Sequence, residues 1–103
     1  MTYQELYDIL AQTGLPMALH HWEHPPKPPY GVYYDDYTDN FAADNIAYHT
    51  IQHVWVELYA PRRSREAEEK IEAALTGADL YWDRSSDYID SERLWRTRYE
   101  MEV

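Results

Sequence analysis

Histidines are the side chains in this sequence best suited to bind a metal ion. His20, His21 and His24 lie close together, directly before a proline-rich segment. His49 and His53 are four residues apart on an expected strand, about 13 Å by strand rise, which is too far to chelate one ion. No H-E-x-x-H or similar metal-binding spacing occurs. We therefore interpret the histidines as surface residues, with His20, His21 and His24 as weak metal candidates.

Carboxylates and serines are the other groups that could perform chemistry. Asp35 and Asp36 are adjacent and could support acid–base catalysis, or join a mixed metal site, but such pairs are common among 19 acidic residues. Ser85 and Ser86 lie in a polar segment with no evident histidine partner. The sequence has no G-x-S-x-G turn, P-loop or glycine-rich dinucleotide turn. We expect no enzymatic activity and no cofactor.

Length and composition narrow the class of protein. The 103 residues predict a single domain, 1–103, with one hydrophobic core. Cysteine is absent, which excludes disulfides and thiolate metal sites, and no apolar run is long enough to span a membrane. The polar N-terminus does not resemble a signal peptide, so we expect a soluble cytoplasmic protein.

Charge and aromatic content bear on the partners. The net charge of −10 opposes direct binding to a nucleic-acid backbone, which requires clustered lysine or arginine. The 11 tyrosines and four tryptophans suit either a core or a protein interface, because their rings are apolar and their tips polar. These residues make an interaction surface plausible without choosing between the two roles.

The residues before the first long strand predict a helix and then extended chain. Thr2 and Glu5 form a capping-box pattern, and the apolar spacing predicts a helix over Tyr3–Thr13, ended by Gly14 and Pro16. The following residues favour a short strand near 17–22. Residues 24–29, His-Pro-Pro-Lys-Pro-Pro, predict an extended connector; we favour a rigid spacer over an SH3-type ligand.

A hairpin is predicted in the middle of the chain. Tyr30–Asp35 reads as a strand, and Asp39–Asn45 as a loop or hairpin tip that carries an exposed Phe41. Asn45–Pro61 is rich in β-branched and aromatic residues and predicts a long central antiparallel strand. We expect this strand to be exposed near His49 and His53 and buried over residues 54–59.

The C-terminal part predicts a second helix. Arg62–Arg65 is the one compact basic cluster, and we interpret it as the surface at the helix start rather than a phosphate site. Ser64 can cap a helix over Glu66–Leu75, with Gly77 just after its end. An apolar stripe and two charge pairs four residues apart support this helix: Ala67, Ile71, Ala74 and Leu75, with Glu66–Lys70 and Arg65–Glu69.

Strands complete the predicted fold. Leu80–Trp82 suggests a short strand and Asp83–Asp90 a polar turn. Leu94–Val103 alternates apolar and charged residues, which is typical of a strand with one buried face. The element order predicts an α+β fold: an antiparallel sheet of about four strands with two helices packed on one face.

Several segments, taken together and in this order, resemble a family of small proteins from the morphogenesis clusters of long-tailed (siphovirus-type) bacteriophages and prophages. They cover most of the chain, although none is specific alone. The matching segments are Thr13–Pro16, Pro28–Tyr30, Asn40–Asp44, Glu57–Tyr59, Glu66–Leu75, Tyr88–Glu92 and Tyr99–Val103. The element order is also similar to that of tail terminator (tail-to-head joining) proteins.

The resemblance implies a minor structural protein of the virion, present in the bacterial host cytoplasm and then in the particle. It implies a homo-oligomeric, hexameric ring that can be monomeric when free, with the tail tube and head-completion proteins as partners and no specific nucleic acid or membrane. An acidic ring lumen would repel DNA and let it slide. As interface candidates we select Asp39, Asn40, Phe41, Tyr33 and Tyr37.

A different class of function also fits a small acidic chain. A DNA-mimicking inhibitor of a host defence or restriction nuclease would carry a similar charge. Such a mimic should display carboxylates in rows that resemble phosphates. Here many acids alternate with bases or lie at a helix start, as in Glu66–Lys70 and Arg96–Glu102, which favours the structural role.

Overall fold

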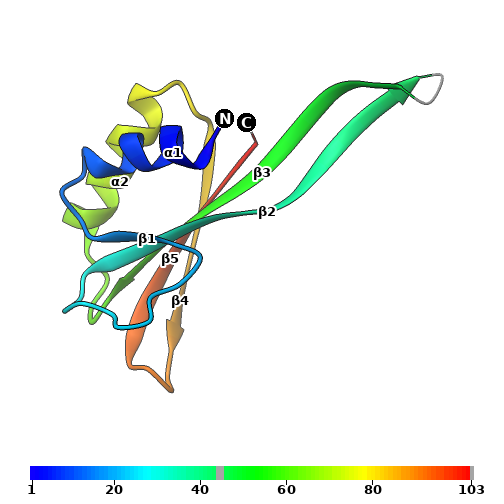
Figure 1. Ribbon diagram of the computed structural model, residues 1–103. Coiled ribbons are helices and arrows are strands. Elements are labelled where there is room, and N and C mark those ends of the chain that lie inside the picture. The colour runs from blue at the N-terminus through cyan, green and yellow to red at the C-terminus, as the bar shows by residue number, and fades with distance from the viewer. Residues whose placement is uncertain (44–45, 103) are drawn as a thin grey trace.

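The computed structural model describes the backbone of residues 1–43 and 46–102, and the side chains of these residues except those of 36–51. The elements, in chain order, are α1 (Tyr3–Ala11), β1 (Met17–Leu19), β2 (Tyr30–Ala43), β3 (Ile46–Ala60), α2 (Arg65–Gly77), β4 (Trp82–Ile89) and β5 (Leu94–Glu102). The strands form one sheet in the order β1-β2-β3-β5-β4, and both helices lie on the same face of it (Figure 1).

The α+β class and the placement of both helices on one face agree with the sequence prediction, but the sheet differs in detail. It has five strands in the described residues, and it is mixed, because β1 pairs with β2 in parallel while all other neighbours are antiparallel. The connector of residues 20–29 carries the chain back to the starting end of β1. As a result β2 begins beside β1 and runs in the same direction.

Side-chain caps begin both helices, as predicted. The hydroxyl oxygens of Thr2 and Ser64 each accept a hydrogen bond from the backbone N–H three residues ahead, at 3.1 and 3.2 Å. The end of α2 differs from the prediction: Gly77 is its last helical residue, and Asp79 takes the left-handed φ of 60°. Aspartate tolerates this conformation better than most residues. Neither described helix is long and apolar enough to span a membrane.

The core lies between the two helices and the sheet. The apolar stripe predicted for α2 is buried, and it packs with side chains from α1 and the three central strands. Alternation in β5 is also confirmed, because Thr97, Tyr99 and Met101 are buried while Arg98 and Glu100, which lie between them, are not. Val103, predicted on the same buried face, lies outside the described residues. The cluster comprises Leu6, Leu10, Tyr33, Val54, Val56, Leu58, Ala67, Ile71, Leu75, Tyr99 and Met101.

Two segments predicted as loops are strands. β2 does not end at Asp35 but continues through residues 39–43, so the predicted loop at Asp39–Asn45 is wrong over its described part. β4 occupies most of Asp83–Asp90, where a polar turn was predicted. Residues 83–88 of this edge strand are all exposed. A strand with so little buried surface lacks the apolar alternation by which strands are recognised.

A two-stranded arm extends from the body of the molecule (Figure 1). We define it as residues 36–43 of β2 and 46–52 of β3, which pair only with each other: β1 reaches no further than Tyr33, and β5 no further than His53. The arm contributes to the elongated shape, with extents of 50 × 29 × 23 Å.

A bulge at Asp36 determines which arm residues share a face with the body. Tyr34 pairs with Trp55 and Tyr37 pairs with His53, so β2 uses one more residue than β3 over this interval. An extra residue reverses the alternation of a strand. The register therefore places Tyr37 on the same sheet face as Tyr34 and Trp55, the face without helices.

Candidate functional site

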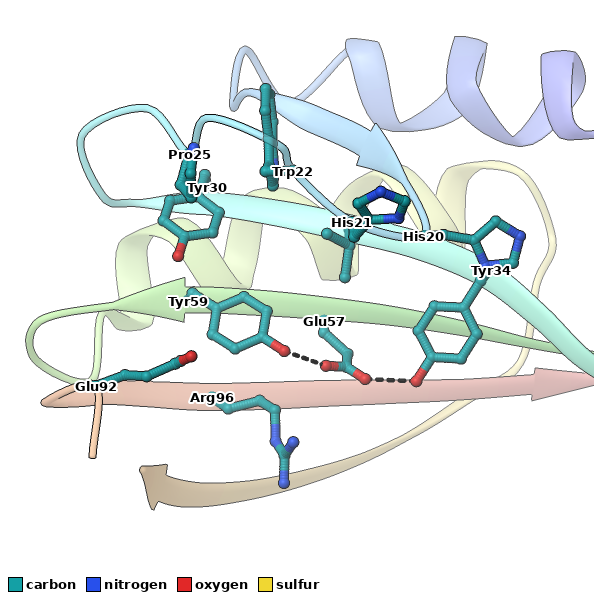
Figure 2. A pocket seen from close by; sticks show the side chains of 11 residues that line it. His20, His21, Trp22, Pro25, Tyr30, Tyr34, Glu57, Tyr59, Glu92 and Arg96 are labelled. Carbon is teal, nitrogen blue, oxygen red and sulfur yellow. Dashed lines mark hydrogen bonds between the residues drawn. The ribbon is translucent and has the colours of Figure 1, made fainter. Parts of the chain in front are cut away.

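The sheet face without helices, which we call the open face, carries a hollow. Its volume is about 530 Å³, and it lies between the 20–29 connector and strands β2, β3 and β5 (Figure 2). The connector is fixed over the sheet by Trp22, whose indole Nε1 donates to the Gly31 carbonyl at 2.9 Å. The lining residues are His20, His21, Trp22, Pro25, Tyr30, Val32, Tyr34, Glu57, Tyr59, Glu92 and Arg96.

Glu57 is the buried acid at the floor of this hollow. Tyr34 and Tyr59 each donate a hydroxyl hydrogen bond to its carboxylate at 2.5 Å, one to each oxygen (Figure 2). Burial, reinforced by the hydrogen bond to Glu57, raises the pKa of Tyr34 to about 12. The same two causes raise the pKa of Tyr59. Both phenols therefore stay protonated near neutral pH and act as donors rather than as bases.

The two arginines on this face are also engaged within the chain. Arg96 makes a two-point contact with Asp87 on β4, at 3.0 and 2.7 Å. The Arg98 guanidinium lies 4.4 Å from the centre of the Trp55 ring, and its Nε is 3.9 Å from Glu57. Glu57 and Arg96 therefore have partners within the chain, and six of the eleven residues that line the hollow carry aromatic rings. Such a surface is suited to a protein contact rather than to acid–base chemistry.

A second cluster of charges joins α2 to the sheet on the opposite face. The Glu68 carboxylate is fully buried and accepts hydrogen bonds from Arg65 at 2.5 Å, Thr97 at 3.0 Å and Arg63 at 3.3 Å. Beside it, Arg84 donates to Glu72 at 2.8 Å. The predicted exposed charge pairs Glu66–Lys70 and Arg65–Glu69 also form.

The sequence analysis did not identify the role of Glu68. A signal was present, because Glu68 stands three and seven residues before Ile71 and Leu75 and so falls on their buried face. Arginines nearby made the burial of this acid feasible.

The root of the arm is joined to α1. Asp35 accepts a hydrogen bond from the Tyr3 hydroxyl of α1 and another from Gln52 of β3, the latter at 3.2 Å. The bond from Tyr3 is the main cause that holds the pKa of Asp35 below its ordinary value. The His20 ring stacks on Tyr34 with 6.0 Å between centroids. Asp35 thus fixes the start of the arm, and the side chain of its neighbour Asp36 lies outside the described residues.

The histidines are dispersed in the structure. His20 and His21 line the hollow and His24 is exposed on the connector, and no three metal-binding side chains converge in the part of the chain described here. His53 is buried, so the predicted exposure at this position is wrong. His53 is covered because β5 pairs with β3 as far as this position, where Glu102 is its partner. The side chain of His49 lies outside the described residues.

The interface candidates fall into two groups. Tyr33 is buried and its ring lies against two tyrosine rings of α1, so it belongs to the core of the single chain. Tyr37, Asp39, Asn40 and Phe41 lie on the β2 side of the arm, and their side chains are outside the described residues. Their role in an interface remains a prediction.

Comparison with known proteins gives a structural likeness. No protein-family model and no curated protein sequence matches the chain. Among solved structures, a chain in the "virion of native gene transfer agent (GTA) particle" is similar, with a TM-score of 0.64 and 14% sequence identity. The likeness covers 98% of this chain and 90% of that one. The two chains therefore share a fold over nearly their whole lengths.

Proposed function

We propose that this chain is a structural protein of a long-tailed phage or of a phage-like particle. The observation that carries the proposal is the shared fold with a chain of the gene transfer agent virion, over 98% of this chain and 90% of that one. Fold likeness alone does not determine function. The arm and the aromatic open face supply the additional support, because both are features of a protein that contacts other proteins.

Within this class we propose the role of a tail terminator or head–tail joining protein that acts as a ring. A ring requires two different surfaces on each copy, which contact each other head to tail. The arm is one such surface, since it extends away from the body that would carry the other (Figure 1). The net charge of −10 would favour passage of DNA through the ring without adhesion, if the acids face the lumen.

We also propose that the chain is not an enzyme. In the hollow, Glu57 is held by two phenols and Arg96 is held by Asp87. A catalytic acid or base needs a free position toward a substrate. These groups instead stabilise the sheet, which is what an assembly protein requires.

The alternative of a DNA-mimicking inhibitor is less well supported. A mimic must present its carboxylates to the surface. Glu57, Glu68, Glu72 and Asp87 are instead engaged by arginines of the chain, and two of the four are buried. Pull-down on a restriction nuclease, in parallel with a lysate containing capsids and tails, tests this directly. Capture of the nuclease alone would favour the mimic.

Deletion of the gene from the phage or prophage tests the proposed role, with electron microscopy of the resulting particles. Tailless heads beside overlong tails are expected for a terminator, whereas tailless heads beside tails of normal length are expected for a head–tail joining protein. Complementation from a plasmid should restore complete particles. Normal, infectious virions without this chain would refute the proposal.

A further inference from the structure

The outer edge of β2 is free along the arm. β1 pairs with residues 31–33 of β2, and the His20 N–H adds a bond to the Tyr33 carbonyl at 3.0 Å. His20 then takes a left-handed φ of 66°, and the chain leaves the sheet. Beyond this point, from Tyr34 to Ala43, no described strand pairs with the outer side of β2. Its backbone groups on that side are available to another strand.

The opposite edge of the sheet, formed by β4, is free as well. β4 pairs with β5 along its 8 residues without a register shift, and no described strand lies on its other side. It has no proline, lysine or bulge, which are devices that keep edge strands from pairing. Two of its three charged residues, Arg84 and Asp87, already have partners, Glu72 and Arg96, within the same copy.

The strand directions allow these two edges to pair with each other. From β2 through β3 and β5 to β4 each neighbour is antiparallel to the last, so β4 runs opposite to β2. Rotation about an axis roughly along the strands preserves their directions. In a ring of that kind, β4 of one copy meets β2 of the next in antiparallel orientation, the more stable form of pairing. The free stretch 34–43 is longer than β4, which therefore fits entirely.

We infer that copies of this chain join edge to edge, with β4 of one copy paired to residues 34–43 of the next. The inference rests on the proposed ring function and specifies the contact that forms the ring. A two-stranded hairpin is at best marginally stable in water, and a third strand stabilises it. The neighbouring β4 supplies that third strand to the arm. The contact uses a different surface on each copy, so it can close by rotation.

Cysteine cross-linking tests this contact, and the chain offers a cysteine-free background. Protein with Ser85→Cys on β4 is mixed with a second protein, enlarged by a tag, that carries Tyr37→Cys, Thr38→Cys, Asp39→Cys or Asn40→Cys. After assembly and mild oxidation, non-reducing gels report the mixed dimer. The matched control replaces Ser85→Cys by Glu69→Cys, at an exposed position of α2. We expect at least one arm position to cross-link to Ser85→Cys about tenfold more than to the control.

Proline substitution tests the backbone groups themselves. Successive N–H groups of a strand point to opposite edges of that strand. One of the variants Ser85→Pro and Ser86→Pro therefore removes a backbone hydrogen bond to β5, and the other removes an N–H donor on the free outer edge of β4. Thermal unfolding distinguishes the two variants. We expect the variant that keeps its melting temperature near that of wild type to associate about tenfold more weakly, as measured by light scattering.

The outcomes separate the contact from the function. If wild-type protein forms rings, or is incorporated in particles, but no arm position cross-links above the control, the edge-to-edge contact is wrong and the structural function stands. Unchanged association of both proline variants leads to the same conclusion. Wild-type protein that stays monomeric at high concentration and is absent from purified particles overturns both proposals.

Discussion

The buried carboxylate of Glu68 provides the sharpest test of how this fold is stabilised. Replacement by glutamine keeps the size of the side chain and removes its charge. Hydrogen bonds that involve a charged group contribute about 1.5–3 kcal/mol each, but the two arginines that donate hydrogen bonds to Glu68 are 45% and 47% exposed and can turn to water. We therefore expect Glu68→Gln to lower the free energy of unfolding by about 2 kcal/mol, near the lower end of that range.

The loss should be visible in thermal unfolding at neutral pH followed by circular dichroism. For a domain of this length, 1 kcal/mol corresponds to about 4–8 °C, so the melting temperature should fall by about 10 °C. Glu66→Gln is the matched control on the same helix, because its side chain is 85% exposed and pairs only with Lys70 in the described residues. Its effect should be below about 0.5 kcal/mol.

The difference in free energy of unfolding between wild type and Glu68→Gln should also depend on pH. Burial raises the pKa of Glu68, but hydrogen bonds from Arg65, Thr97 and Arg63 outweigh it and hold the pKa below the ordinary value of 4.5. A group with a lowered pKa in the folded state stabilises the fold above its unfolded pKa, and this contribution is lost as pH falls through the folded pKa. The difference should therefore shrink below pH 4.5. Equal stability of the two proteins at neutral pH would refute the reasoning.

Three further predictions concern other parts of the molecule. The pKa of Tyr34 is raised to about 12, so the free energy of unfolding should fall as pH rises from 10, the ordinary pKa of tyrosine, toward 12. Absorbance titration of the native protein should show the delayed ionisation of this phenol, and titration of the protein unfolded in urea should not. Gly31→Ala should cost about 1–3 kcal/mol in denaturant unfolding, since its Cβ would lie 2.5 Å from Met17 Sδ and 2.9 Å from the Glu57 carbonyl; wild-type stability would contradict this. Phe41→Ala should impair assembly with little change in the melting temperature, and normal tail length and particle yield would show that Phe41 makes no essential contact.

Local signals in the sequence were sufficient to predict the two helices and the last strand. Thr2 and Ser64 cap helices because their hydroxyls satisfy N–H groups within the same turn, a rule that needs no tertiary information. The alternation in Leu94–Val103 reports burial on one face directly, and it predicted the orientation of β5 over the described residues.

The edges and the open-face hollow depend on long-range contacts and could not be predicted in the same way. β4 is a strand because β5 lies beside it, although its own residues are polar. The hollow forms where the 20–29 connector folds over the sheet and Trp22 bonds to Gly31. Likewise Glu57 appears in the sequence as one acid among many, and only the fold shows that Tyr34 and Tyr59 converge on it.

The bulge at Asp36 has a consequence for how such a chain can evolve. Deleting this one codon would remove the register shift between Asp35 and Tyr37, and the later residues of β2 would exchange one side of the hairpin for the other. The core residues lie before this point or on other elements, so the deletion would leave the packed interior untouched. A lineage could thus invert the β2 side of the arm, and with it the surface offered in the proposed contact between copies, through a single in-frame event.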